Sequence, residues 1–288
     1  MLRRSARPST PGQLFRLANP LAAGAERGSP RGVPNSIALV SELLALQETL
    51  YTSRNPTRRW LHLTRRERVE ELIRKAAASS ASTRALEVGP GSGVYLPLLA
   101  ELFDEVVAAD VEPSFLEQVD RLRERHRNLV PVADDITDTQ LEPQSCDVVL
   151  CSEVIEHIRA SERALEGIRR VLRPGGHLVL STPQPLSPLE VASRVAFLPG
   201  VIDVVRRVYR EPILPTGHVN LMGAAELRRQ LTAAGFQIVE SLKSGVYLPL
   251  VAEFGGRAGL RFEQWLERRL DRGPLDGLLW TQYYLAKA

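Results

Sequence analysis

The feature that most constrains this chain is an alternation of short apolar runs with helical patterns between residues 85 and 181. Continuous apolar runs of this length are typical of strands that are buried on both faces of a sheet. Helices between successive strands indicate that the strands are parallel and that the helices cover both faces of the sheet. We therefore predict an α/β fold with a doubly wound sheet. The predicted strands are residues 85–88, 106–109, 129–133, 148–151, 177–181, 236–242 and 280–285, and the predicted helices include 115–122, 164–172 with Ser161 as its N-cap, and 227–234.

The chain before this alternation divides into two segments. Residues 1–35 mix Pro, Gly, Ala, Ser and Arg without periodicity, which predicts a flexible N-terminal segment. Apolar residues at helical spacing then predict an N-terminal helical cap over 36–79, interrupted near Pro56. The α/β domain itself would then be residues 80–288.

A lid-like insertion is predicted over residues 183–216, after the fifth strand. Its apolar stripe, which includes Val201, Val205 and Val208, lies beside Arg206 and Arg207. Such a helix can roof a site or make peripheral contact with a membrane surface. Packing on its own domain is the simpler interpretation.

Composition and charge exclude several classes of protein. No apolar run approaches the roughly 18 residues of a membrane span. Arg3 and Arg4 are not followed by the apolar stretch of a signal peptide, and Cys146 and Cys151 sit around a predicted buried strand. We therefore expect a cytoplasmic protein with free thiols.

The net charge of +3 is unevenly distributed. Residues 1–80 hold 14 Lys and Arg against 6 Asp and Glu, a balance of +8, so the remainder holds 23 against 28, or −5. A basic segment can meet RNA, an anionic membrane or an acidic partner, but a solvated arginine-rich helix is the simpler interpretation. Only Tyr51 and Trp60 interleave aromatic rings with these charges, so a nucleic-acid partner is not expected.

Three glycines follow the first predicted strand and open a helix. Gly89, Gly91 and Gly93 are spaced G-x-G-x-G, unlike the G-x-G-x-x-G of the dinucleotide fingerprint. Glycines there let the backbone turn sharply and approach a ligand beside the free N–H groups of a helix N-terminus. Asp110 ends the second strand, where a carboxylate can accept bonds from both hydroxyls of a ribose, and Asp134 and Asp135 follow the third.

These motifs together resemble those of class I S-adenosylmethionine-dependent methyltransferases. The matching stretches are 87–93, Asp110, Asp135, 146–157 and the Leu-Arg-Pro-Gly-Gly run at 172–176, which corresponds to a turn before the fifth strand. The resemblance extends from about residue 80 to the C-terminus. It implies an enzyme with a Rossmann-like, seven-stranded sheet whose last strand is antiparallel, and S-adenosyl-L-methionine as its cofactor.

The resemblance also implies which residues contact the cofactor. The implied contacts are Glu87 near the amino group, Gly89, Gly91 and Gly93 against the methionine and ribose portions, Asp110 on the ribose hydroxyls, Asp135 on the adenine amino group, Ile136 beside the adenine ring, and Ser152 at the end of the fourth strand.

The segment after the fourth strand holds the candidates for catalysis. If it forms a helical turn, Glu153, Glu156 and His157 lie at i, i+3 and i+4 and share a face, and His218 can join them. Such a group can bind Mg²⁺ or Zn²⁺ and activate a hydroxyl. The pattern is similar to the metal site of ubiquinone-biosynthesis O-methyltransferases and of small-RNA 2′-O-methyltransferases. Without a metal, His157 acts as a base, with Glu156, or is a packing residue.

These observations predict a methyltransferase that acts on the oxygen of a small or lipid-like acceptor, with a nucleic-acid acceptor as second choice. Two other functions fit the sequence less well. An NAD(P)-dependent oxidoreductase disagrees with the glycine spacing and with the lack of a Tyr-x-x-x-Lys set. A non-catalytic S-adenosylmethionine-binding regulator is disfavoured because the cofactor motifs are intact.

Overall fold

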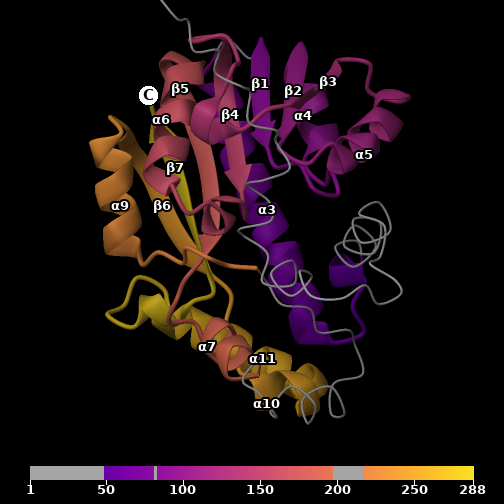
Figure 1. Cartoon of the computed structure of the whole chain (residues 1–288). Helices are drawn as coiled ribbons and strands as arrows, with labels where there is room; N and C mark the ends of the chain where they lie inside the picture. The colour runs from indigo at the N-terminus through magenta and orange to yellow at the C-terminus, as the bar shows by residue number, and fades with distance from the viewer. Residues whose placement is uncertain (1–48, 81–82, 197–216) are drawn as a thin grey trace, which may run out of the picture.

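The computed structural model describes residues 49–80, 83–196 and 217–288. The described strands form one seven-stranded sheet in the order β3-β2-β1-β4-β5-β7-β6 (Figure 1). All pairings are parallel except those of β7 with its two neighbours. The predicted α/β, doubly wound fold with an antiparallel last strand is therefore confirmed.

The bounds of the elements are as follows. The strands are β1 (Arg84–Val88), β2 (Glu105–Asp110), β3 (Leu129–Ala133), β4 (Cys146–Ser152), β5 (Leu172–Pro183), β6 (Gln237–Ser244) and β7 (Thr281–Lys287). The helices are α3 (Pro56–Ala78), α4 (Leu96–Leu102), α5 (Pro113–Arg123), α6 (Ser161–Val171), α7 (Pro188–Ala196), α9 (Ala224–Ala233), α10 (Pro249–Phe254) and α11 (Gly256–Leu270), with 3-10 turns η1 (Ile136–Asp138), η2 (Ile155–His157) and η3 (Asp276–Leu278).

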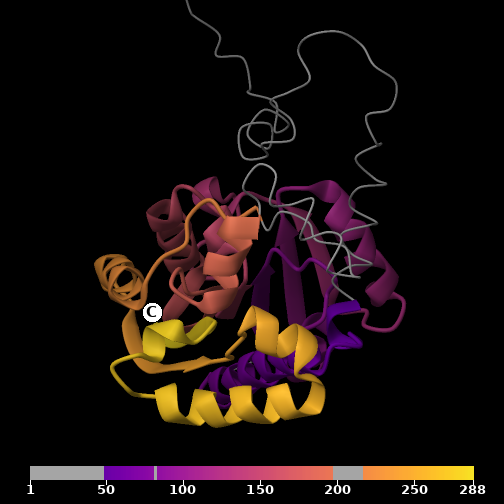
Figure 2. The same ribbon diagram turned by 90° about the horizontal axis from the view of Figure 1, so that it is seen from below.

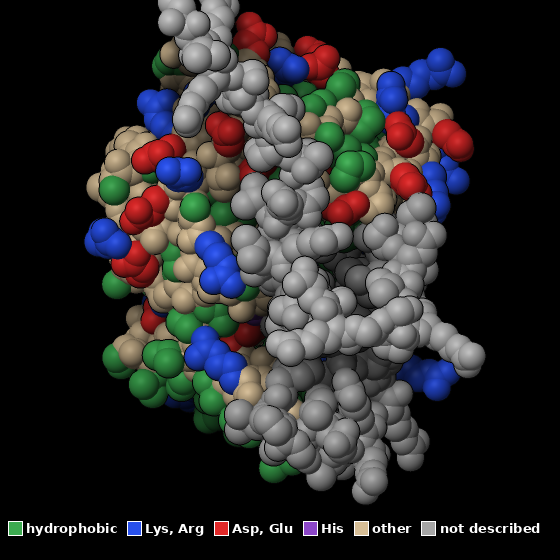
Figure 3. Space-filling view, in the orientation of Figure 1, with side chains coloured by type: hydrophobic (Ala, Val, Ile, Leu, Met, Phe, Trp, Pro, Cys, Tyr) green, Lys and Arg blue, Asp and Glu red, His purple; other side chains and the backbone are tan. Residues whose placement is uncertain are grey.

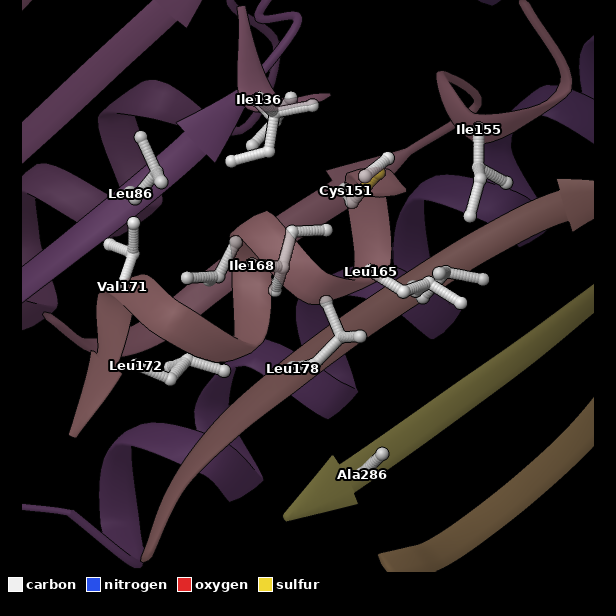
Figure 4. Close-up of a cluster of buried hydrophobic side chains, with 14 of the residues drawn as sticks. Leu86, Ile136, Cys151, Ile155, Leu165, Ile168, Val171, Leu172, Leu178 and Ala286 are labelled. Atoms are coloured by element: carbon white, nitrogen blue, oxygen red, sulfur yellow. The ribbon is translucent and has the colours of Figure 1, made fainter. Parts of the chain in front are cut away.

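Alternate residues of the central strands serve two separate cores, because successive side chains of a strand point to opposite faces. Leu86, Val149 and Leu178 belong to a cluster with α6 and α9, part of which is drawn in Figure 4. Ala85 and Val148, their neighbours in sequence, belong to a cluster with α3, α4 and α5. The sheet is thus buried on both faces, which explains its continuous apolar runs.

Helix α3 is part of the second core. Asn55 caps it by accepting hydrogen bonds from the N–H groups of Thr57 and Arg58, so the predicted break near Pro56 is its first turn. The predicted apolar face is confirmed, with five residues buried under the sheet: Val69, Leu72, Ile73, Ala76 and Ala77. Beyond the sheet, α3 continues towards α10 and α11 (Figure 1).

Two local predictions were wrong. Ser161 does not cap α6; its hydroxyl is buried and donates to Gln230 Oε1 of α9 at 2.8 Å, because α6 and α9 pack against each other there. The run at 172–176 is not a turn before the fifth strand. It belongs to β5, which pairs with β4 from Leu172 onward through a register shift and accommodates Gly175 at φ +81°.

Parts of the predicted organisation lie outside the described residues. These are the N-terminal segment 1–35, the first part of the helical cap, and 197–216 of the insertion with its apolar stripe. Among the helices that the structure describes, none has both the length and the hydropathy that a membrane span requires.

Gly167 marks the closest approach of α6 to η1. A Cβ at this position would lie 1.9 Å from the backbone oxygen of Ile136. We expect Gly167→Ala to lower the free energy of unfolding by about 1–3 kcal/mol, since backbone must shift to admit the methyl group. Urea denaturation measures this. Gly277→Ala is the matched control, because a Cβ there meets nothing within 4 Å, and equal losses in both variants would contradict the expectation.

Candidate active site

The predicted cofactor residues lie at the carboxyl ends of four neighbouring strands. Strand β1 lies between β2 and β4, and Val88 is level with both Ala109 and Cys151. The chain positions that follow are Gly89, Asp110 and Ser152, so the parallel register brings these three to one edge of the sheet. Ligands of open α/β sheets bind at this edge.

The glycine loop is held in a conformation that favours glycine. Gly89, Gly91 and Gly93 have φ values of +65°, +52° and +72°. A Cβ on Gly89 would lie 2.6 Å from a methyl carbon of Val154, which follows β4. The loop therefore lies directly against the segment that carries the candidate catalytic residues.

Glu87 is a buried acid at the end of β1. Its side chain is 3% exposed, and its Oε2 atom has no hydrogen-bond partner within the described residues. Burial raises the pKa of Glu87 to about 8. An unpaired carboxylate in such a place is costly unless a cation or donor meets it, so the residue fits the amino group that the resemblance assigns to it.

Asp110 ends β2 in a partly enclosed position. Its Oδ1 accepts a hydrogen bond from the N–H of Glu112 at 2.9 Å, and Glu112 in turn caps α5. Burial, opposed by that backbone hydrogen bond, raises the pKa of Asp110 to about 6. A carboxylate that is partly buried and oriented in this way is suited to accept hydrogen bonds from ribose hydroxyls.

Asp135 and Ile136 follow β3. One oxygen of Asp135 accepts from both the N–H and the hydroxyl of Thr137, at 2.9 and 2.8 Å, and so caps η1. Ile136 is 5% exposed and packs in the core cluster of Figure 4. Both residues therefore have structural roles in addition to the cofactor contacts predicted for them.

Glu153 does not lie in a helical turn, which corrects the expected i, i+3, i+4 arrangement. It adopts φ +56°, and η2 begins only at Ile155. Its carboxylate contacts Arg65 at 2.7 Å and accepts from the Ser181 hydroxyl at 2.9 Å. Glu153 is thus engaged by Arg65 and Ser181, and it is not among the described residues that form the group able to hold a metal.

The other three candidates do come together. Glu156, His157 and His218 each offer a ligand atom, and these atoms lie within 4.8 Å of one another. Glu156 is fully buried; its Oε2 accepts from the Thr182 hydroxyl at 3.0 Å, and its Oε1 has no partner among the described residues. Burial, with a contribution from Glu153, raises the pKa of Glu156 well above its ordinary range.

Both imidazoles have their Nδ1 atom bonded within the protein, which leaves Nε2 as the atom that a ligand can use. His157 Nδ1 lies 3.2 Å from the carbonyl oxygen of Gly217, which only accepts, so the Nδ1 carries the proton and Nε2 holds a lone pair. Part of the side chain faces solvent, but burial of the ring and the nearby His218 lower the pKa of His157. The neutral ring is the form that accepts a proton or binds a metal.

His218 is oriented by a carboxylate. Its Nδ1 lies 3.1 Å from Oε2 of Glu190 on α7, and the other oxygen of Glu190 accepts from the indole N–H of Trp280 at 3.4 Å. The His157 and His218 ring centroids are 5.2 Å apart. A histidine whose second nitrogen bonds a carboxylate is the usual arrangement around metal-ligating imidazoles.

Sequence reasoning missed three residues of this region: Arg65 on α3, Glu190 on α7 and Trp280, which precedes β7. Arg65 places its guanidinium 5.1 Å from the Trp280 ring centroid and one nitrogen 3.2 Å from His62 Nδ1. Although burial opposes it, the Glu153 carboxylate raises the pKa of Arg65 above its ordinary value. No motif marks Arg65, Glu190 or Trp280, because their partners are distant in the chain.

Comparison with known proteins agrees with this geometry. The family model for a methyltransferase domain matches residues 60–241. A relative from Mycolicibacterium smegmatis, named "Probable S-adenosylmethionine-dependent methyltransferase", is 30% identical over 215 residues, covering 73% of each chain. The ubiquinone biosynthesis O-methyltransferase of Xanthomonas euvesicatoria pv. vesicatoria is 31% identical over 177 residues, which are 59% of this chain and 68% of that one.

A solved structure extends the similarity to the fold. The N-methyltransferase NodS from Bradyrhizobium japonicum WM9, in complex with S-adenosyl-L-homocysteine, superposes with a TM-score of 0.53 at 19% identity, covering 88% of this chain and 98% of its own. The chain therefore belongs to the methyltransferase-domain family. It is an S-adenosylmethionine-dependent methyltransferase, which confirms the predicted class of enzyme and its cofactor and sets aside the oxidoreductase and regulator alternatives.

Proposed function

We propose that this enzyme methylates an oxygen atom of a small or lipid-like acceptor, with His157 and Glu156 as its catalytic residues. The observation that carries the proposal is the buried Oε1 of Glu156, which has no partner among the described residues, beside two imidazoles whose Nδ1 atoms are already bonded. The name of the Xanthomonas relative, an O-methyltransferase, also supports an oxygen acceptor. A nitrogen acceptor is the alternative that the test below separates.

The cofactor half of the site is proposed residue by residue. S-adenosylmethionine supplies a methyl group on a sulfonium, already activated for displacement, so alignment and exclusion of water are the protein's main tasks. Glu87 would meet the ammonium, Asp110 the ribose and Asp135 the adenine. The glycine loop, Ile136 and Ser152 would make the remaining contacts with the cofactor. Their common position at one edge of the sheet supports this assignment.

In the acceptor half, His157 would accept the proton of an acceptor hydroxyl at Nε2. Its Nδ1–H bond to Gly217 fixes the tautomer that this requires. In the alternative, Glu156, His157 and His218 would hold a divalent ion; the His157 Nε2 lone pair would then bind the ion rather than the proton, and the ion would favour ionisation of the hydroxyl. Two nitrogens and one carboxylate suit Zn²⁺ better than Mg²⁺. A cation would also offset the cost of burying Glu156.

Acceptor assays combined with metal analysis test the proposal. We expect methyl transfer to phenolic and catechol acceptors but not to matched anilines, loss of activity with chelator, and close to one bound divalent ion per chain. Glu156→Gln should abolish metal retention, while Glu153→Gln should keep it because Glu153 lies outside the group. Full activity in the presence of chelator would rule out a catalytic metal, and turnover of the anilines alone would rule out an oxygen acceptor.

Cofactor binding should release a proton from Glu87. At pH 7 a carboxyl with a pKa of about 8 is roughly nine-tenths protonated. Pairing with the cofactor's ammonium requires the ionised form, so we expect nearly one proton released per bound molecule at pH 7 and almost none above pH 9. Calorimetry in two buffers of different ionisation enthalpy measures this, and Glu87→Gln should abolish the release.

The same shift predicts a stability difference. The unfolded chain loses the Glu87 proton near pH 4.5 and the folded chain near pH 8, so the ionisation costs folded stability as pH rises between these values. Without cofactor, Glu87→Gln should therefore gain stability relative to the wild type over that window and change little below it. A constant difference across the window would contradict the buried, unpaired carboxyl.

A further inference from the structure

Helix α11 presents a solvent-exposed face that is basic and aromatic. Residues of one continuous arc of the helix are exposed, and we call them the α11 face: Arg257, Ala258, Arg261, Phe262, Trp265, Arg268 and Arg269. The face holds four arginines and no acid. Helix α11 lies beyond the carboxyl ends of β5 and β6, the sheet edge that also carries the site. Among the described residues, no hydrogen bond or ion pair joins this face to Glu156, His157 or His218, so the methyl-transfer chemistry does not account for it.

The acids of α11 lie on its opposite side and are bonded within the protein. Glu263 is fully buried and accepts from the Thr57 hydroxyl and the N–H of Leu248, and Glu267 accepts from the N–H of Gly245. No ion pair within the described residues involves the arginines of the α11 face. Their positive charge is therefore directed to solvent.

Exposed apolar side chains accompany this charge. Phe262 and Trp265 are each 45% exposed, and on the adjoining helix α10 Leu250 and Phe254 are 76% and 72% exposed. Helices α10 and α11 pack against each other at the end of the molecule seen in Figure 2. By contrast, the side of the molecule drawn in Figure 3 shows Lys and Arg side chains interspersed with Asp and Glu over its described part.

We propose that the α11 face binds the surface of a membrane that contains anionic lipids. Arginines beside Trp and Phe on one helix face match the charge of lipid headgroups and the apolar boundary beneath them. The exposed Leu250 and Phe254 of α10 add apolar area. The α11 face consists only of residues between 257 and 269, and the inference does not depend on the identity of the methyl acceptor.

Other occupants fit the face less well. A second copy in a symmetric dimer would set the same four arginines against each other. The N-terminal residues 1–48 carry 6 Arg against 3 Glu, so they are repelled rather than attracted. Base stacking would need free aromatic faces, but Trp265 lies between Phe262, stacked at 5.8 Å, and the Arg269 guanidinium at 5.4 Å.

Co-sedimentation of the full chain with vesicles tests the proposal. We expect binding to phosphatidylcholine vesicles that contain phosphatidylglycerol, none to phosphatidylcholine alone, and dissociation at high salt. Arg261→Gln with Arg268→Gln should lower the partition coefficient roughly thirtyfold, at about 1 kcal/mol for each arginine. The control is Arg125→Gln with Arg127→Gln, which removes the same charge from an exposed segment after α5 and should change little.

Circular dichroism and cofactor affinity establish that each variant is folded. A further variant, Phe262→Ser with Trp265→Ser, should also bind the anionic vesicles more weakly. The proposal is overturned by a lack of binding to anionic vesicles, or by equal losses in the two arginine pairs. It is also overturned if the α11 variants abolish binding to single-stranded RNA or self-association but leave vesicle binding unchanged.

Discussion

Replacing His157 by alanine is expected to lower kcat by about 10²–10⁴-fold while the affinity for S-adenosylmethionine stays unchanged. The side chain is exposed and packs in neither core, so its loss removes the proton acceptor or metal ligand without a large cost in stability. Steady-state kinetics with a phenolic acceptor and calorimetry with the cofactor measure the two quantities separately. The readout is therefore specific to the acceptor half of the site.

His126→Ala is the matched control for that prediction. His126 follows α5, outside the group formed with Glu156 and His218, and its removal should leave kcat within about twofold, as expected of surface substitutions away from a site. If His157→Ala kept full activity, His157 would be a packing residue and the proposed chemistry would be wrong. A parallel loss of cofactor affinity would instead indicate that His157 belongs to the half of the site that holds S-adenosylmethionine.

The second large effect is expected at Arg65. Arg65→Met leaves the Glu153 carboxylate without its cation in a site where the two side chains are only 12% and 18% exposed. We expect a loss of about 2–4 kcal/mol in the free energy of unfolding, at the lower end of the cost of breaking a buried ion pair. We also expect a fall in kcat, since Glu153 sits at φ +56° directly before η2 and Arg65 holds it there.

A double variant separates the structural from the functional role of Arg65. Arg65→Met with Glu153→Gln removes both charges and should recover most of the stability but not kcat, because the ion pair that fixes the segment before Glu156 is then absent. Arg65→Lys keeps the charge and should rescue part of both. Arg123→Met breaks the exposed ion pair with Asp120 and should cost no more than about 1 kcal/mol. Recovery of kcat in the double variant would show that Arg65 does not position the site.

The strands and the cofactor motifs were accessible from the chain alone because their signals are local. A run such as 148–151 is buried on both faces wherever its sheet forms, and parallel strands deliver their carboxyl ends to one edge. Helices α10 and α11 were not predicted. Gly255 and Gly256 interrupt the segment between the two helices, and α11 keeps the buried acid Glu263 on its inner face; both weaken an apolar helical pattern.

The sequence by itself determined the class of fold, the family and the order in which Glu87, Asp110 and Asp135 meet the sheet edge, because each depends on short-range patterns in a repeating α/β unit. Only the tertiary structure decided the acceptor half. Glu153 is positioned by its ion pair with Arg65, 88 residues away, and His218 by its bond to Glu190, 28 residues away. The i, i+3, i+4 spacing of a helix therefore does not describe how these side chains are arranged. Ion pairs and hydrogen bonds between distant segments outweigh local helical preference at such a junction, and no spacing in the chain reveals them.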